Sequence, residues 1–302
     1  MPRALLILVS VVSFVGLAPR AARAQMYESV GVRAQGMGGA FVGVADDSTA
    51  TWWNPAGLAS GPYFDLLAEY GRPDVVPSGQ QLVGVAAGFP ALGLSYYRLP
   101  LSQMQPPGAT AGPGSSRQDP GYLSQFGATF GQSIGHLVLA STVKLLHAGD
   151  DTHVDLDLGA MIRVGRVKAG ISLRNLHETD FSAGGVTELS LQRVARAGVS
   201  VTGSPGSVVL TADADADLTS VTTAIGDERH VAGGVEAWLF NRVLGVRGGV
   251  SAETIHSTRS ESGGLSLMVL SGQYLKTYVD GQLTGGSDEM RRGWGADLRV
   301  TF

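Results

Sequence analysis

The sequence lacks cysteine entirely, and only 16% of its 302 residues are charged. The absence of Cys excludes disulfides, thiolate metal sites and cysteine nucleophiles. Ordinary soluble domains carry about 25% charged residues, well above the content of this chain. Only three of the 22 basic residues are Lys and no basic block is present, so the composition gives no support to a nucleic-acid partner.

Glycine, by contrast, is abundant: 43 of the 302 residues, about 14% and roughly twice its average usage. Gly disfavours helix interiors by about 1 kcal/mol per residue, so this content argues against a helix-rich globular enzyme. The hydrophobic content of 44% and the formal net charge of −4 argue equally against a disordered chain.

Residues 1–24 are typical of a secretory signal peptide. Arg3 supplies the positive charge, residues 4–17 form a short apolar stretch, and Ala-Arg-Ala at 22–24 forms a cleavage site before Gln25. No later segment offers the roughly 20 consecutive apolar residues of a transmembrane helix. An exported chain of this kind is either a soluble β protein or an outer-membrane β-barrel.

Alternation of apolar and polar residues decides between these two classes. Over 153–164 the even positions are all apolar, whereas the odd positions include His153, Asp155, Asp157 and Arg163, as expected for a strand with two unlike faces. Similar runs predict about fourteen strands, and no crossover helices separate them, so the sheet is antiparallel. The predicted strands are 63–70, 80–89, 91–99, 121–131, 135–147, 153–164, 166–174, 194–202, 208–218, 230–239, 243–251, 263–271, 273–283 and 292–302.

The connections between these strands alternate in length. Short turns separate long connections, which are predicted at 71–79, 100–120, 176–188, 219–229, 252–262 and 284–291, with a moderate one at 147–152. Bacterial outer-membrane barrels have short periplasmic turns and long extracellular loops. In such a barrel the apolar faces contact lipid, and charges in the middle of the polar faces line the lumen. Residues 62–302 therefore predict an all-β, transmembrane antiparallel barrel of about 14 strands in the bacterial outer membrane, with the lipid bilayer as a partner.

The predicted barrel ends in an aromatic residue, Phe302. This ending resembles the signal by which outer-membrane barrels are recognised by their assembly machinery, which we expect as a second partner.

Residues 25–61 do not alternate, and we expect them to form a compact N-terminal plug in the lumen. Gly36, Gly38 and Gly39 allow close backbone approach or positive φ, and Asp46 and Asp47 offer helix-capping side chains. Asn54-Pro55 favours a turn, followed by Ala56 and Gly57. The glycines are not a dinucleotide fingerprint, because the sixth position is Phe41 and no βαβ unit follows.

In this order, the Gly-rich stretch, the Asp-rich stretch and the Asn-Pro-Ala-Gly-Leu motif at 54–58 resemble the FadL/TodX superfamily of outer-membrane barrels. The segments 169–176 and 230–249 are similar to its PorV/PorQ-like branch. The FadL resemblance implies passive uptake of small hydrophobic or amphipathic solutes, captured at the outer face and passed by movement of the plug. The PorV resemblance implies instead a docking or secretion-system component that binds exported proteins and moves no solute.

Two groups of side chains are candidates for function. The aromatic residues of the plug, Phe41, Trp52 and Trp53, are candidates for solute contact, whereas strand-end aromatics such as Tyr70, Tyr96, Tyr97, Trp238 and Trp294 are more typical of interfacial girdles. The charges predicted to line the lumen are Asp155, Asp157, Asp213, Asp215 and Asp217, with Arg163, Arg166, Lys168, Arg174 and Arg196. Such a network can stabilise the barrel, anchor the plug or bias solute charge, and the sequence leaves all three open.

Catalytic chemistry has little support, and we expect no enzyme, metal or cofactor. The Asp213-x-Asp215-x-Asp217 run departs from an EF-hand loop, which needs Gly and Glu where this chain has Leu218 and Ala224. The six His form no HExxH pair, and no G-x-S-x-G elbow is present.

Overall fold

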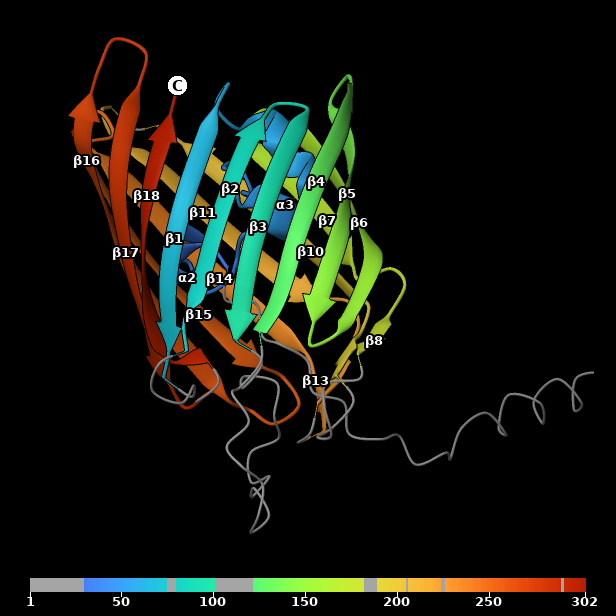
Figure 1. Cartoon of the computed structure of the whole chain (residues 1–302). Helices are drawn as coiled ribbons and strands as arrows, with labels where there is room; N and C mark the ends of the chain where they lie inside the picture. The colour runs from blue at the N-terminus through green and yellow to red at the C-terminus, as the bar shows by residue number, and fades with distance from the viewer. Residues whose placement is uncertain are drawn as a thin grey trace, which may run out of the picture.

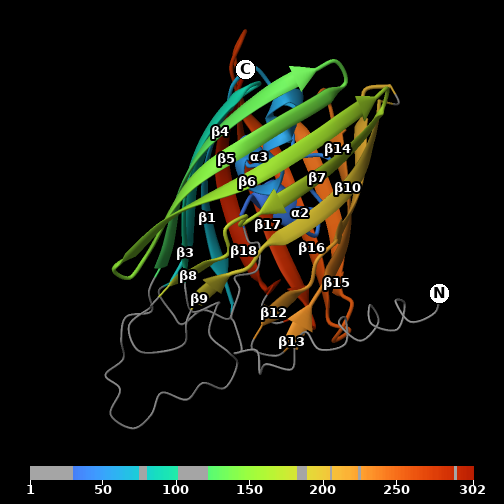
Figure 2. The same ribbon diagram turned by 90° about the vertical axis from the view of Figure 1, so that its right-hand side faces the viewer.

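The computed structural model describes residues 30–74, 80–100, 122–181, 189–204, 206–223, 226–288 and 291–302. The predicted signal peptide and residues 25–29 lie outside the described residues. Fourteen strands form a closed antiparallel barrel (Figures 1 and 2), which confirms the predicted architecture. Among the described helices, none has the length and apolar character needed to cross a membrane.

Each barrel strand pairs with its neighbours in the chain, and β18 closes the barrel on β1 from Asp65↔Thr301 to Pro73↔Gly293. Neighbour pairing is the topology that alternation and turn signals can specify without long-range information. The barrel strands are β1 (Asp65–Pro73), β2 (Leu82–Phe89), β3 (Leu92–Pro100), β4 (Tyr122–Ile134), β5 (Leu137–Ala148), β6 (Asp151–Val164), β7 (Val167–Arg174), β10 (Val194–Gly203), β11 (Val209–Asp217), β14 (His230–Leu239), β15 (Leu244–Glu253), β16 (Arg259–Ser271), β17 (Lys276–Gly286) and β18 (Gly293–Thr301).

Three connections differ from their prediction. The connection after β7 holds a small hairpin of β8 (Thr179–Phe181) and β9 (Leu189–Leu191), and the one after β11 holds β12 (Val221–Thr223) and β13 (Gly226–Glu228). Strands of three residues are too short for alternation to reveal. The connection between β5 and β6 is a two-residue turn, in which Gly149 takes a φ of 60°.

The two ends of the barrel differ. The tight turns after β2, β4 and β6 lie at the end where β18 stops, near the label C in Figure 1, and we name this the short-turn end. The opposite, long-loop end carries the longer connections, apart from the β5–β6 turn. By the rule for bacterial barrels, the short-turn end is periplasmic and the long-loop end is extracellular.

The wall has an apolar outer face and a polar inner face, as a membrane barrel requires. On β5 the outward Leu139, Val143 and Leu145 are exposed, whereas the inward Thr142 and Lys144 are completely buried. This arrangement reverses that of a soluble barrel.

Residues 30–61 lie inside the barrel, where Figure 2 shows their short helices through the gaps between strands, and we name them the lumenal segment. It contains α2 (Val32–Gly36), α3 (Ala50–Trp53) and the 3-10 helix η1 (Pro55–Ser60), and most of its side chains are buried. Helix α2 packs on β15–β18, whereas η1 packs on β2 and β4–β7. The segment therefore bridges opposite sides of the lumen.

Glycines of the wall allow the backbone of the lumenal segment to touch it. Gly234 and Gly249 are paired in register on β14 and β15, and a Cβ atom on either would overlap Met37. On β10, a Cβ on Gly198 would lie 2.7 Å from the backbone nitrogen of Gly43. Part of the glycine excess is thus explained by close approach of two backbones.

We expect Gly234→Ala to destabilise the folded barrel by roughly 1–3 kcal/mol, because the added methyl group has to displace Met37. Gly233→Ala is the matched control, since a Cβ on Gly233 meets no atom within 4 Å. Thermal unfolding, followed by heat-modifiable migration on gels, measures the difference. Equal transition temperatures of the two variants would contradict close packing at Gly234.

Candidate functional site

The interior of the barrel has two unlike halves. On β10, β11, β14, β15, β17 and β18 the buried inward side chains include many charges, among them Arg196, Asp213, Glu236, Arg247 and Asp280. On β2–β5, the inward side chains nearest the long-loop end are apolar and buried, namely Leu82, Leu99, Leu123 and Leu146. We name these the charged half and the apolar half.

The charged half holds the lumenal segment through carboxylates that accept backbone hydrogen bonds. Asp215 Oδ2 accepts from the N–H groups of Phe41 at 2.7 Å and Val42 at 2.8 Å, and Asp213 Oδ2 accepts from Val44 N–H at 2.9 Å. These donors lie in an irregular stretch, so the wall supplies the acceptors that a helix or strand would otherwise provide. Of the three roles left open for the lumenal acids, this geometry matches anchoring.

Asp217, the third acid of the run, instead pairs with Arg196 Nε at 2.7 Å. Lys168 Nζ donates to the carbonyl of Val44 at 2.7 Å, so a predicted basic residue also holds the segment. On the neighbouring strands, Asp155 and Asp157 pair with Lys144 Nζ at 3.1 and 2.6 Å. Lys144 was not among the predicted lumenal charges.

Arg33 joins the segment to the wall and to itself. Its Nε and Nη2 atoms donate to the two carboxylate oxygens of Glu236 at 2.8 and 2.6 Å, a bidentate geometry. Its Nη1 atom donates to Asp46 at 2.6 Å and to Asp47 at 3.2 Å. Sequence reasoning did not select Arg33. The available signal was that it is the lone basic residue of residues 30–61, in a stretch that also holds two acids.

Asp46 is held ionised by this contact. Burial opposes its charge, but Arg33 and Lys168 outweigh burial and keep the pKa of Asp46 well below its usual value of 3.8. Lys168 Nζ lies 3.5 Å from Asp46 Oδ2.

The motif residues of the lumenal segment shape its irregular backbone. Gly38 and Gly39 take φ of 73° and 79°, the left-handed region in which Gly is favoured. Asp47 Oδ1 accepts from the N–H of Thr49 at 3.0 Å, and Asn54 Oδ1 accepts from that of Ala56 at 3.2 Å.

Helix-start geometry explains one further motif position, and close packing explains two. Pro55 opens η1, where it lacks only an N–H that would go unused. A Cβ on Gly57 would overlap Ala45, and a Cβ on Gly36 would lie 2.7 Å from Arg247 Cδ.

Two predicted lumenal charges lie elsewhere. Arg163 and Arg166 are exposed at the short-turn end of β6 and in the turn that follows. Arg163 follows Asp157 by six residues, about 20 Å along a strand at the usual rise of ~3.3 Å per residue, so it does not reach the acids. The prediction that these two arginines line the lumen is corrected by their position.

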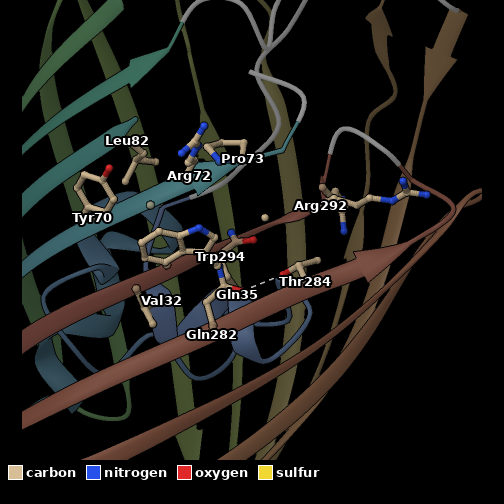
Figure 3. A pocket seen from close by; sticks show the side chains of 14 residues that line it. Val32, Gln35, Tyr70, Arg72, Pro73, Leu82, Gln282, Thr284, Arg292 and Trp294 are labelled. Atoms are coloured by element: carbon tan, nitrogen blue, oxygen red, sulfur yellow. Dashed lines mark hydrogen bonds between the residues drawn. The ribbon is translucent and has the colours of Figure 1, made fainter. Parts of the chain in front are cut away.

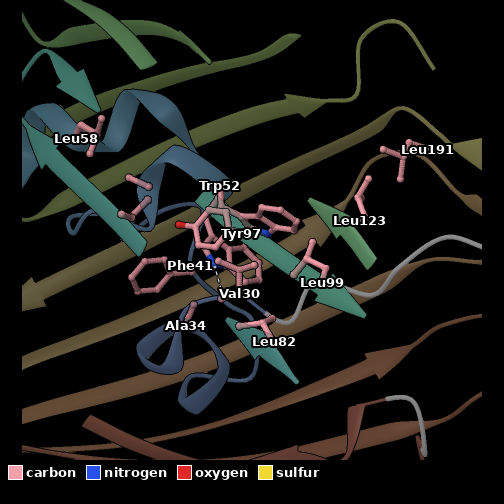
Figure 4. Packing of buried hydrophobic residues seen from close by; sticks show 14 of the residues in the cluster. Val30, Ala34, Phe41, Trp52, Leu58, Leu82, Tyr97, Leu99, Leu123 and Leu191 are labelled. Atoms are coloured by element: carbon pink, nitrogen blue, oxygen red, sulfur yellow. Dashed lines mark hydrogen bonds between the residues drawn. The ribbon is translucent and has the colours of Figure 1, made fainter. Parts of the chain in front are cut away.

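The aromatic residues predicted to contact solute are all buried. Trp53 Nε1 donates to the carbonyl of Val30 at 3.0 Å, and its ring lies 6.2 Å from that of Phe41. Trp52 faces the apolar half, with its ring edge-on to Tyr97 at 5.4 Å (Figure 4). Arg174 Cζ lies 4.0 Å from the centre of the Trp52 ring on another side. Trp52 therefore lies between Arg174 of β7 and the apolar half.

Two aromatics expected in interfacial girdles also face inward. Tyr97 is fully buried, and Trp238 is buried beside Tyr278 with ring centres 5.5 Å apart. Tyr96 and Tyr97 are adjacent, so strand alternation sends one outward and the other inward. Phe302 stays at the barrel end, where its ring lies 5.0 Å from Phe64.

The lumenal segment contacts the apolar half mainly through packing. Val30, Trp52 and Leu58 belong to one buried cluster with the four wall leucines (Figure 4). The hydrogen bonds from Thr51 to this half are long: 3.5 Å to the Tyr97 hydroxyl and 3.4 Å from the Thr142 hydroxyl. Strong polar contacts thus fix one side of the segment, and apolar contacts cover the other.

A small cleft lies beside α2 (Figure 3). Val32 and Gln35 of the segment line it together with side chains of β1, β2, β17 and β18, among them Leu82, Gln282 and Trp294. In the described residues, no group of three or more His, Asp and Glu side chains is placed to hold a metal ion.

Comparison with solved structures identifies the fold. The chain is similar to the CymD monoaromatic hydrocarbon channel, with a TM-score of 0.56 and 12% identity over 89% of this chain and 95% of that one. It is also similar to the Pseudomonas putida toluene transporter TodX, with a TM-score of 0.54 and 12% identity over 92% of this chain and 98% of that one. For a Pseudomonas aeruginosa FadL homologue the TM-score is 0.53, with 10% identity over 92% of this chain and 98% of that one. No protein-family model and no curated protein matches the sequence.

The chain therefore has the fold of the FadL/TodX outer-membrane barrels. At the level of fold, this confirms the resemblance noted in the sequence and the prediction of a bacterial outer-membrane barrel. The PorV/PorQ-like branch stays a prediction.

The ion pairs of Asp46 predict a pH dependence. Because the pKa of Asp46 is lowered by folding, its stabilisation is fully present above the usual pKa of 3.8 and is lost as the pH falls through the folded value. We expect wild type to exceed Asp46→Asn in melting temperature at about pH 5, with the difference shrinking towards about pH 2. Thermal unfolding in detergent across this range measures it, and a constant difference would contradict the ion-pair assignment.

Proposed function

We propose that the protein is a passive channel of the outer membrane for small hydrophobic or amphipathic solutes. The observation that carries the proposal is the apolar half of the lumen, where inward leucines on four neighbouring strands lead from the long-loop end to Trp52. Water-filled porins have a polar interior, so an apolar lining favours an apolar solute. The solved structures with this fold, described as a monoaromatic hydrocarbon channel and a toluene transporter, support the same class.

The two halves of the lumen suggest how solute passes the lumenal segment, which we propose to act as a plug. Hydrogen bonds to charged groups contribute about 1.5–3 kcal/mol each, so the three bonds to Asp213 and Asp215 resist displacement. On the apolar half, a hydrophobic solute replaces the contacts that it breaks, and little free energy is lost. Solute therefore parts the segment from β2–β5 while the charged half holds it in place.

The moving part in this proposal is the contact of Trp52 and Thr51 with β3. Separation of the Trp52 and Tyr97 rings opens a path lined by Leu99 and Leu123. No nucleotide or ion coupling is suggested by the residues of this path. A docking component of the PorV type moves no solute, so its function does not require an apolar lumen. We therefore favour uptake over docking.

A disulfide across the proposed path tests this movement. A Cβ on Gly93 of β3 would lie 2.7 Å from Thr51 Cγ2, so Thr51→Cys with Gly93→Cys places two thiols together. Since the chain has no other Cys, the bond formed is unambiguous. In liposomes that contain the protein, we expect oxidation of this variant to abolish uptake of a labelled aromatic hydrocarbon, and reduction to restore it.

The matched control links the segment to the charged half. A Cβ on Gly295 of β18 would lie 3.3 Å from Val32 Cγ2, so Val32→Cys with Gly295→Cys forms a disulfide that leaves the contact with β2–β5 free. Its uptake should be the same when oxidised and when reduced. Uptake by the oxidised Thr51→Cys/Gly93→Cys variant at the wild-type rate would refute the path, and uptake no faster than in empty liposomes for wild type would refute transport.

A further inference from the structure

A row of arginines lies on the outer wall at the long-loop end. Arg72 and Arg98 lie within two residues of the ends of β1 and β3, and Arg292 directly precedes β18. Arg72 and Arg98 are exposed, and Arg292 is half-buried. Outward aromatic side chains lie next to them towards the middle of the wall, namely Tyr70, Tyr96 and Trp294, each about 40% exposed. We name these six residues the arginine–aromatic patch.

Neighbouring groups hold the patch in shape. The rings of Tyr70 and Trp294 lie 5.7 Å apart, and Arg72 is paired with Trp294 in register across β1 and β18. Arg292 Nε donates to the carbonyl of Gly286 at 2.8 Å, which fixes its stem. On β3, Arg98 Cζ lies 3.8 Å from the centre of the Tyr122 ring. The guanidinium groups are therefore preorganised.

Carboxylates of the wall do not neutralise the two exposed arginines. In the described part of the chain, Arg72 and Arg98 form no ion pair, although the chain as a whole is acidic. Asp74, two residues after Arg72, is exposed, and Asp288 pairs with Arg291 at 3.5 Å. Arg72 and Arg98 thus carry two positive charges that no described carboxylate pairs with.

At the long-loop end, the described residues combine exposed arginines with outward aromatic side chains on one side of the barrel. Arg193, Arg229 and Arg259 are also exposed at this end, but the outward side chains near them on β10, β11, β14 and β15 are small or aliphatic: Ala195, Ala216, Val231 and Ala252. An aromatic belt that only anchors a barrel in its bilayer surrounds it at both interfaces. A one-sided cluster of cations and aromatics points to a ligand of matching chemistry.

We propose that the arginine–aromatic patch binds a phosphorylated lipid of the outer leaflet. Guanidinium groups bind phosphate oxygens in pairs, and Tyr and Trp rings lie at the level of lipid headgroups, with the apolar wall beside them for acyl chains. The long-loop end faces the outer leaflet when the short turns are periplasmic. Tyr70, Arg72, Arg292 and Trp294 also line the cleft beside α2, so the proposed lipid site adjoins this cleft.

Binding of lipid A to the purified barrel in non-ionic detergent tests the proposal, with lipid A that carries both phosphates compared with the same lipid after enzymatic removal of the phosphates. Each arginine near an anionic lipid surface contributes roughly fivefold to affinity. We expect Arg72→Gln/Arg98→Gln/Arg292→Gln to raise the Kd for the phosphorylated lipid at least about tenfold. The matched control is Arg163→Gln/Arg166→Gln, which removes two exposed arginines from the short-turn end and should leave the Kd unchanged.

Heat-modifiable migration confirms that each variant is folded before binding is measured. Unchanged affinity in the triple variant, an equal loss in the control variant, or equal binding of the dephosphorylated lipid would each overturn the proposal. Displacement of the lipid by an equal concentration of inorganic phosphate would also overturn it, since it would define a phosphate site instead of a lipid site. Hydrocarbon uptake by the triple variant, measured separately, keeps this result distinct from the channel proposal.

Discussion

Backbone N–H groups enclosed in a membrane barrel need protein acceptors, and here carboxylates of the wall supply them. Besides the bonds from Phe41, Val42 and Val44 to Asp215 and Asp213, Gly31 N–H donates to Glu69 and Ser48 N–H donates to Asp65, both at 2.8 Å. Without these acceptors an irregular segment would leave unpaired polar groups in the interior, at a cost of about 1–3 kcal/mol each. Asp213 and Asp215 lie on β11, and Asp65 and Glu69 lie on β1, so carboxylates hold the segment at two parts of the wall.

The division of the lumen follows from this constraint. Where carboxylates meet the segment, the wall has glycines such as Gly234 and Gly198, because backbone must approach backbone. Where no carboxylate is needed, on β2–β5, leucines fill the space and pack against Trp52. Hydrogen bonds to carboxylates anchor the segment, whereas its contacts with β2–β5 are mainly apolar. We propose that solute displaces the segment from β2–β5.

Much of the fold could be predicted from the sequence, because each strand pairs with its neighbours in the chain and alternation sets its faces. The same rule placed Asp213, Asp215 and Asp217 on the inner face. Contacts across the lumen could not be predicted: Arg33 and Glu236 are 203 residues apart, and their meeting depends on how the closed barrel places β14 opposite α2. Alternation likewise predicts on which face of the sheet Arg163 lies, but not its position along the strand. That position at the short-turn end keeps Arg163 away from the acids.

Hydrogen exchange of the lumenal segment tests the central claim most directly. Exchange of backbone amides is measured by mass spectrometry on the barrel in detergent, with and without an aromatic hydrocarbon. We expect amides of residues 41–44 to exchange slowly in both conditions, whereas those of residues 50–58 exchange faster when hydrocarbon is present. Faster exchange at 41–44 than at 50–58, or hydrocarbon acting first on 41–44, would contradict anchoring by the charged half.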